Sequence, residues 1–175
     1  MAVRTGRRRA GYAPVMAYRG QFDRLIKAEE RGRAITSTRT IAVFDDGLVV
    51  CAVGVYGDAR PARGMFGSLR LTRRPPRRGS GPARGDEHIR AGAEASGSGV
   101  TFAETWPKSE LIPFAVIDRI VLTRPRQVSE LAIYADAAGG GSEDKLAYLG
   151  DLSAGQVRDA LGPVLGDRLQ IEVPE

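Results

Sequence analysis

The sequence predicts a mostly β, β-rich α+β fold. We expect a bent antiparallel sheet or partly open barrel of about seven strands, closed by a C-terminal helix and preceded by a short N-terminal helix. Three observations carry this prediction. Short β-branched runs alternate with turns rich in Gly and Pro. An Asp-Gly pair separates two apolar runs, which is a strong hairpin signal. A capping box opens the last apolar stripe of helical period.

The first residues carry basic charge but no hydrophobic pattern. Residues 1–14 are rich in Arg and Gly, with Arg7, Arg8 and Arg9 adjacent, so we expect a disordered basic tail. Residues 15–175 are long enough for a single domain. Met16 heads the more structured stretch, and translation from Met1 or from Met16 are both open.

The short N-terminal helix is predicted for residues 21–31, "QFDRLIKAEER". Phe22, Leu25 and Ile26 would share one face of this helix, and Gly32 would end it. We expect this face to dock on the core of the domain.

The next stretch predicts a hairpin. Apolar, β-branched runs at 38–44 and 48–56 flank Asp45-Asp46-Gly47, and Asp-Gly suits the positive φ angles of a tight hairpin turn. A third strand is expected near residues 64–72.

The middle of the chain has a different composition. Residues 73–98 combine Pro75-Pro76 with many Gly, Ser and Ala and few large apolar side chains. Such a composition buries too little surface to offset the entropy of ordering. We therefore expect a mobile insertion, which at this length is commonly functional or disordered.

The second half predicts further strands before a last helix. Pro113 should break a longer β-run in two. The expected strands lie at 99–104, 109–112, 115–123, 129–136 and 145–152.

The start of the last helix is the most specific local signal. Ser153 and Gln156 form a capping box, and Leu152 and Val157 form the hydrophobic staple beside it. The apolar stripe that follows consists of Val157, Leu161, Val164 and Leu165. We expect a break or a kink at Gly162-Pro163, because proline removes a hydrogen bond and clashes with the preceding turn.

Charge is divided unevenly along the chain. Residues 1–100 hold 19 Arg or Lys against 9 Asp or Glu, whereas residues 101–175 hold 7 against 12. A basic half could meet phosphate, anionic lipid or an acidic partner. However, 23 Arg against 3 Lys, with no Asn, is typical of coding bias in a GC-rich genome. We favour the coding bias as the explanation.

The sequence argues against an enzyme. His88 is the single histidine and falls in the predicted mobile insertion, and Cys51 is the single cysteine in an apolar run. A catalytic base needs rigid positioning, so we expect no catalytic residues, no metal site and no cofactor. The adjacent carboxylates Glu29-Glu30, Asp45-Asp46 and Glu143-Asp144 are expected to be solvated. With no secretory signal or membrane-spanning run, we expect a cytoplasmic protein.

The order of seven β-runs and a final amphipathic helix resembles bacterial pleckstrin-homology-like domains. The succession "ELIPFAVIDRIVLTR", "SELAIYAD", "KLAYLGDL" and "SAGQVRDALGPVLGDRL" carries the resemblance, which covers residues 35–170. It implies a bent sheet with a terminal helix plugging one end, and a role in protein interaction. Phosphoinositide-binding members use basic residues between their first two strands, where this chain has Asp45-Asp46-Gly47.

Two groups of residues are candidates for binding. Arg73, Arg74, Arg77 and Arg78 form a basic arm, and Trp106 is the single tryptophan, a residue enriched at interface hot spots. We expect a binding or scaffold module whose partner is another protein. Electrostatic association with nucleic acid or an anionic membrane surface through the Arg-rich segments is the alternative.

Overall fold

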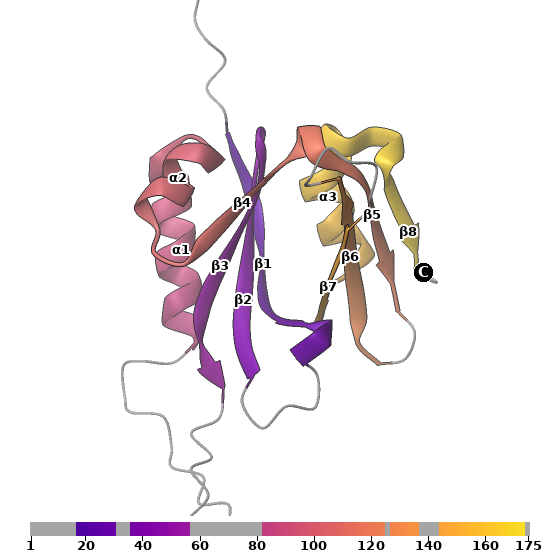
Figure 1. Ribbon diagram of the computed structural model, residues 1–175, viewed down its shortest axis with the longest axis horizontal. Coiled ribbons are helices and arrows are strands. Elements are labelled where there is room, and N and C mark those ends of the chain that lie inside the picture. The colour runs from indigo at the N-terminus through magenta and orange to yellow at the C-terminus, as the bar shows by residue number, and fades with distance from the viewer. Residues whose placement is uncertain (1–16, 31–35, 57–81, 125–126, 137–143, 174–175) are drawn as a thin grey trace, which may run out of the picture.

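The computed structural model describes residues 17–30, 36–56, 82–124, 127–136 and 144–173 (Figure 1). Eight strands form one sheet that does not close, in the order β4-β3-β2-β1-β7-β6-β5-β8. Neighbouring strands run antiparallel except β5 and β8, which are parallel. The predicted fold class is confirmed: a β-rich, partly open sheet with a C-terminal helix.

The strands divide at Pro113 into two consecutive halves. The N-terminal half contains β1 (Tyr18–Lys27), β2 (Thr36–Phe44), β3 (Gly47–Tyr56) and β4 (Ser109–Pro113). The C-terminal half contains β5 (Ile117–Thr123), β6 (Ser129–Ala135), β7 (Asp144–Gly150) and β8 (Leu169–Glu172). The helices are α1 (Pro82–Ser96), α2 (Gly99–Thr105) and α3 (Ala154–Leu165), with short 3-10 turns η1 (Ala28–Glu30), η2 (Phe114–Val116) and η3 (Gly166–Arg168).

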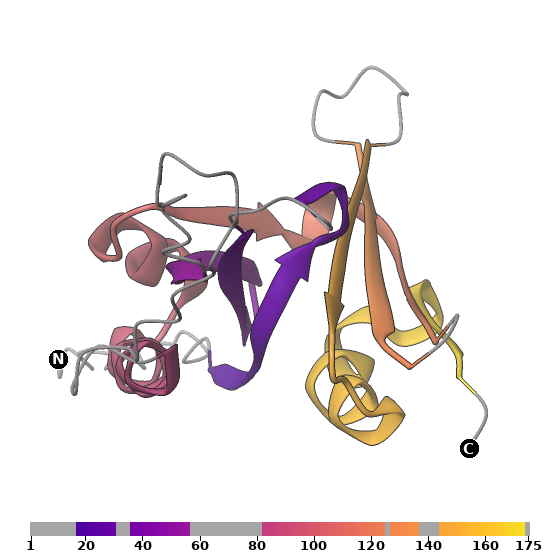
Figure 2. The same ribbon diagram turned by 90° about the horizontal axis from the view of Figure 1, so that it is seen from below.

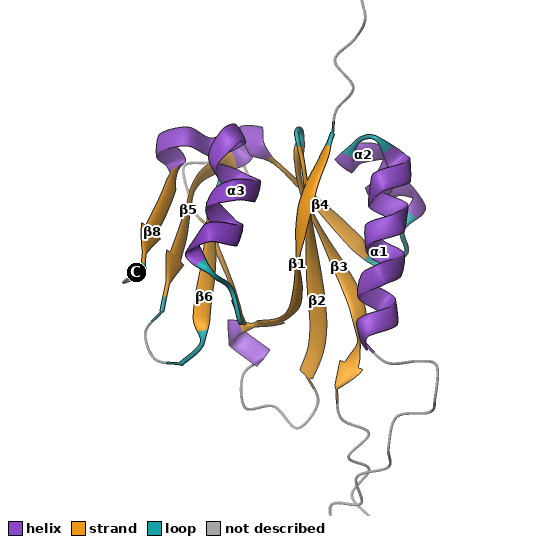
Figure 3. Ribbon diagram, turned by 180° about the vertical axis from the view of Figure 1, so that it is seen from behind, coloured by secondary structure: helices purple, strands orange, loops and turns teal. Residues whose placement is uncertain are grey.

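The two halves of the sheet are set at an angle to each other and meet where β1 pairs with β7 (Figure 2). Helices α1 and α2 lie on the side of the N-terminal half that is turned away from the C-terminal half. Helix α3 lies beside the C-terminal half (Figures 1 and 3). The sheet is therefore covered by separate helices on its two faces.

The larger core joins the two halves through α3. Phe22, Leu25 and Ile41 from the N-terminal half pack in one cluster with residues of β5 to β7 and with the α3 residues Val157 and Leu161. All five side chains are buried. Burial of this apolar surface is the main force that holds the halves together.

A second, smaller core lies on the opposite face of the N-terminal half. Residues of β2 and β3 pack there against α1 and α2. The cluster consists of Ala42, Phe44, Val49, Cys51, Ile89, Ala93 and Phe102. Its presence explains why β2 and β3 are apolar on both faces.

The predicted hairpin is confirmed at β2 and β3, whose register places Val43 opposite Leu48. The sequence analysis predicted that the turn carboxylates Asp45 and Asp46 are solvated. That prediction is wrong, because both accept hydrogen bonds within the protein. Asp45 accepts hydrogen bonds from the backbone N–H of Ala17 and from Arg19. Asp46 accepts from the N–H groups of Gly99 and Val100, at 2.9 and 3.3 Å. The turn thus anchors both the start of β1 and the first turn of α2.

The predicted helix over residues 21–31 is wrong, because residues 18–27 form β1 and only Ala28–Glu30 form a helical turn. The register of β1 against β2 shifts between Phe22 and Leu25, and Arg24 has a φ of 57°. This bulge turns Phe22 and Leu25, three positions apart, into the same core. The three-residue spacing of Phe22 and Leu25 is also that of residues on one face of a helix, which explains the wrong prediction.

The mobile insertion predicted for 73–98 is wrong for its second part, and the strand predicted for 99–104 is also wrong. Residues 82–96 form α1 and residues 99–105 form α2, which begins at an N-cap, Ser98. Residues 73–81, like the strand predicted at 64–72 and the tail at 1–14, lie outside the described residues. Small residues allow α1 to approach the sheet closely: a Cβ on Gly85 would collide with the Val53 side chain.

The capping box that opens α3 is confirmed, with the Ser153 side chain accepting from the Gln156 N–H. Of the break or kink expected at Gly162-Pro163, the break is wrong, because α3 continues through Pro163 to Leu165. Pro163 is exposed and lies in the last turn, where little helix follows it. Strand β8, which the sequence analysis did not predict, comes next and pairs with β5.

Candidate functional site

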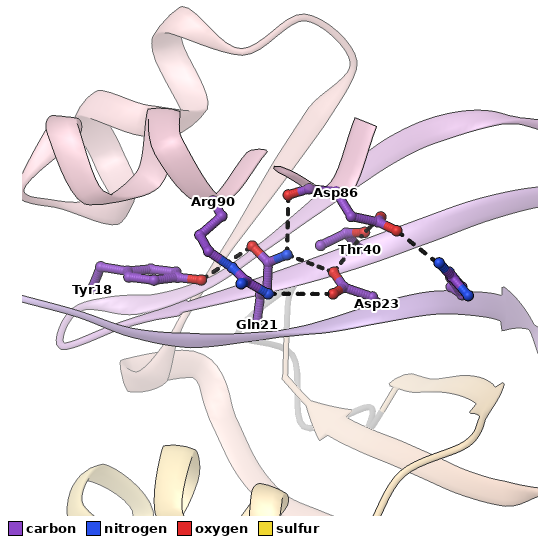
Figure 4. A network of polar contacts seen from close by, with 7 residues as sticks. Tyr18, Gln21, Asp23, Thr40, Asp86 and Arg90 are labelled. Carbon is purple, nitrogen blue, oxygen red and sulfur yellow. Dashed lines mark hydrogen bonds and ion pairs between the residues drawn. The ribbon is translucent and has the colours of Figure 1, made fainter. Parts of the chain in front are cut away.

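A network of polar side chains lies where α1 meets β1 and β2 (Figure 4). Strand β1 contributes Tyr18, Gln21 and Asp23, strand β2 contributes Thr40, and α1 contributes Asp86 and Arg90. Asp86 is only 6% exposed, which is rare for a charged residue unless it has partners.

The contacts of this network connect the helix to the sheet. The Thr40 hydroxyl donates to Asp86 Oδ1 at 2.7 Å and lies 3.4 Å from Asp23 Oδ1. Gln21 Nε2 donates to Asp23 Oδ1 at 2.7 Å and to the Asp86 carbonyl at 3.1 Å. These bonds replace the water that Asp86 loses when α1 covers it.

Two arginines compensate the carboxylates at the edge of the network. Arg90 Nη2 lies 3.8 Å from Asp23 Oδ2, and Arg24 Nε lies 3.6 Å from Asp86 Oδ2. Both arginine side chains are more than half exposed, at 56% and 64%. Ion pairs of this length with exposed arginines contribute little.

Burial is the largest cause of the raised pKa values of two residues in the network, Asp23 and Tyr18. Desolvation, followed by the charge of Asp86, raises the pKa of Asp23 above its ordinary value of 3.8. Desolvation also raises the pKa of Tyr18 to about 12. Tyr18 therefore stays protonated at neutral pH and donates to Gln21 Oε1 at 3.1 Å.

A second candidate site is a pocket of about 320 Å³ beside β7. Its walls come from the end of β1, from η1 and from the β6–β7 pair. The pocket is lined by Lys27, Ala28, Glu29, Glu130, Lys145, Leu146, Ala147 and Tyr148. Its four charged side chains form two pairs: Lys145 Nζ is 2.9 Å from Glu130, and Lys27 Nζ is 3.7 Å from Glu29.

Tyr148, which contributes to this pocket wall, is fully buried in the larger core. Among the described residues its hydroxyl has no hydrogen-bond partner, and desolvation raises the pKa of Tyr148 to about 12. A buried hydroxyl without a partner loses its hydration and gains nothing in return.

Replacement of Tyr148 with phenylalanine is therefore expected to stabilise the protein by about 1 kcal/mol. The ring keeps its packing, and the unpartnered oxygen is removed. Urea denaturation of the wild type and of Tyr148→Phe measures the difference. A loss of stability would contradict the expectation, because it would mean that the hydroxyl makes a favourable contact.

The predicted binding residue Trp106 has a structural role in the fold. It is half-buried at the end of α2, where its ring lies 5.5 Å from the ring of Phe102 and its backbone N–H bonds to the Phe102 carbonyl. The other predicted binding residues, Arg73, Arg74, Arg77 and Arg78, lie outside the described residues. The structure thus does not place Trp106 and the basic arm together.

His88 and Cys51, the single histidine and the single cysteine of the chain, lie outside both candidate sites. His88 is exposed on α1, and desolvation raises the pKa of the buried Cys51 thiol to about 12, which keeps it protonated and unreactive. Over the described ranges, no three His, Cys, Asp or Glu side chains gather as metal ligands. In the same ranges, no helix is both long and apolar enough to cross a membrane.

Both sites escaped the sequence analysis because their members are distant in the chain. Gln21 and Asp86 are separated by 65 positions, and Thr40 and Asp86 by 46. Asp86 itself stands in a segment that was expected to be a loop. The one local signal was that Asp86 stands three positions before Ile89, which would place both residues on the same face of a helix.

Comparison with protein-family models, with curated proteins and with solved structures finds no match to this chain. The resemblance to pleckstrin-homology-like domains therefore stays a prediction.

Proposed function

We propose that this protein is a non-enzymatic binding module for another protein, and that it holds an extended segment of that partner at the open edge of β7. One observation carries the proposal. Strand β7 pairs with β6 along its whole length, but it pairs with β1 only through Leu149 and Tyr148. The pocket lies where this second pairing stops.

The open edge favours a polypeptide as the occupant. Among the described residues, Asp144 to Ala147 form no ladder on the side of β1, where the turn η1 is the neighbour of β7, so no strand pairs with their backbone groups there. An added strand satisfies such groups, and this is a recurring mode of peptide recognition. Side chains of the added strand would meet the half-buried Leu146 and Ala147.

The charges around the pocket also favour a polypeptide. Two lysines and two glutamates, already in pairs, give the pocket no net charge. A polyanion such as nucleic acid needs uncompensated positive charge. A polar peptide can instead form hydrogen bonds and ion pairs with these lysines and glutamates in place of their present pairing.

The test is a selection of random ten-residue peptides displayed on phage, followed by fluorescence anisotropy with one selected peptide. Ala28→Trp, which fills the pocket from η1, is expected to abolish binding of that peptide. Ala115→Trp is the matched control, because Ala115 is exposed on η2, away from the pocket, and this variant should bind normally.

The mode of binding can be tested on the peptide. N-methylation of alternate peptide amides should abolish binding in one register and leave it unchanged in the other, because only every second N–H of a strand points to its neighbour. Failure to select any peptide, or binding that survives Ala28→Trp, would contradict the proposal. Salt-sensitive binding of the whole chain to duplex DNA or anionic vesicles would instead support the electrostatic alternative.

A further inference from the structure

Asp23 and Asp86, here called the carboxylate pair, face each other across the contact between α1 and the sheet. Both carboxylates lie within reach of one Thr40 hydroxyl, at 3.4 and 2.7 Å. A hydroxyl has a single proton to donate, and the shorter distance assigns that proton to Asp86. Two carboxylates in a partly buried site cannot both ionise without mutual repulsion.

A proton on Asp23 would change the character of this contact. The protonated carboxyl gains an O–H donor, while Thr40 Oγ1 and the Asp86 carboxylate are acceptors close to it. Repulsion between the two carboxylates would then be replaced by attraction, at the cost of the long Arg90–Asp23 ion pair, which contributes little because Arg90 is more than half exposed.

We propose that proton uptake by the carboxylate pair tightens α1 on the sheet, and that proton loss loosens it. Helices α1 and α2 would thus form a pH-sensitive cover over the outer face of β2 and β3. The inference does not depend on the proposed peptide site, which lies at η1 and β7.

The other groups around Asp23 do not remove the effect. Strand β1 contributes Tyr18, which stays neutral, and Arg24, which contacts Asp86. Strand β2 contributes Thr40, which has no charge. Helix α1 contributes Arg90 beside Asp23, and Glu94, whose negative charge acts on Tyr18.

The sign follows from proton linkage. The pKa of Asp23 is raised in the docked state, so the docked state binds more protons than the undocked state. The added stability is complete below the ordinary value of 3.8 and is lost as pH rises through the docked-state pKa. For one proton, the change in the docking equilibrium cannot exceed about tenfold per pH unit.

Cys51 provides the readout. It is the single cysteine of the chain, it is fully buried, and it packs in the smaller core beneath α1 and α2. A thiol reagent can reach it only when this cover opens. Dividing the labelling rate of the unfolded chain by that of the native protein at each pH gives a protection factor that is corrected for thiol ionisation.

The protection factor of Cys51 in the full chain is expected to fall as pH rises above the ordinary carboxyl pKa of 3.8, with a slope no steeper than about tenfold per unit. In Asp23→Asn it should be high and independent of pH. Asp118→Asn, on the exposed side of β5, should keep the wild-type dependence. If Asp23→Asn does not fold, Asp86→Asn breaks the same pair and should also flatten the profile.

Amide hydrogen exchange in β5 and β6, corrected for intrinsic rates, separates local from global effects. Protection there should not follow the profile of Cys51. The proposal is overturned by a wild-type profile that is flat or rises with pH. It is equally overturned by pH dependence that survives removal of the carboxylate pair, or by a parallel change in β5 and β6.

Discussion

Replacing Leu161 with alanine is expected to lower the free energy of unfolding by about 2–5 kcal/mol, the usual cost of truncating a buried leucine. Leu161 is fully buried on α3 and belongs to the core that both halves of the sheet share. The cavity would lie where α3 holds these halves together, so little of it can be closed by relaxation. Urea denaturation followed by circular dichroism measures the loss.

The loss of stability in Ser153→Ala, at the start of the same helix, is the comparison for the loss in Leu161→Ala. Ser153 is exposed and contributes the cap rather than the core, so its loss should cost about 1 kcal/mol. Asp159→Ala, also exposed on α3, should change stability by less than about 0.5 kcal/mol. A larger cost for Ser153→Ala than for Leu161→Ala would show that α3 is not docked as described.

Replacing Phe102 with alanine is expected to cost about 3–5 kcal/mol. Its ring lies between those of Phe44 and Trp106, with centroids 5.6 and 5.5 Å away, and it is fully buried. The substitution removes the ring that connects α2 to the hairpin. Thermal or urea denaturation reports the change.

Val100→Ala is the matched control for this prediction, because Val100 lies on the same helix but is 48% exposed. Its expected effect is within about 0.5 kcal/mol. If both substitutions had equally small effects, α2 would not be packed on β2 and β3. If the smaller core stayed equally stable without the Phe102 ring, the structural role assigned to Trp106, which packs on that ring, would also be contradicted.

Local signals in the sequence were sufficient for several elements. The hairpin at Asp45-Asp46-Gly47 and the Ser153 capping box each depend on a few adjacent residues, and both appear in the structure. The positive φ angles predicted for the Asp-Gly pair do not, since neither Asp46 nor Gly47 has one. The strands β4 to β7 were likewise predicted from local apolar runs, and they appear in the structure.

Other elements depended on contacts that no short window contains. Residues 82–96 were judged by their lack of large apolar side chains, yet Ile89 and Ala93 are sufficient when the sheet below is itself apolar. The bulge in β1 needed its partner strand to be recognised, since the Phe22–Leu25 spacing alone indicates a helix. Asp86 became a site residue only because α1 placed it over Thr40.

The arrangement of the two halves has a consequence for synthesis on the ribosome. Residues 18–113 complete the first four strands before any residue of the C-terminal half has been made. However, Phe22, Leu25 and Ile41 finish their packing only against β5 to β7 and α3. The emerging chain therefore carries an exposed apolar face for about 50 further residues, which at about 5–20 residues per second lasts several seconds. During that interval chaperones can bind the exposed face of the unfinished sheet, and the chain can aggregate through it. The exposure ends when α3 docks.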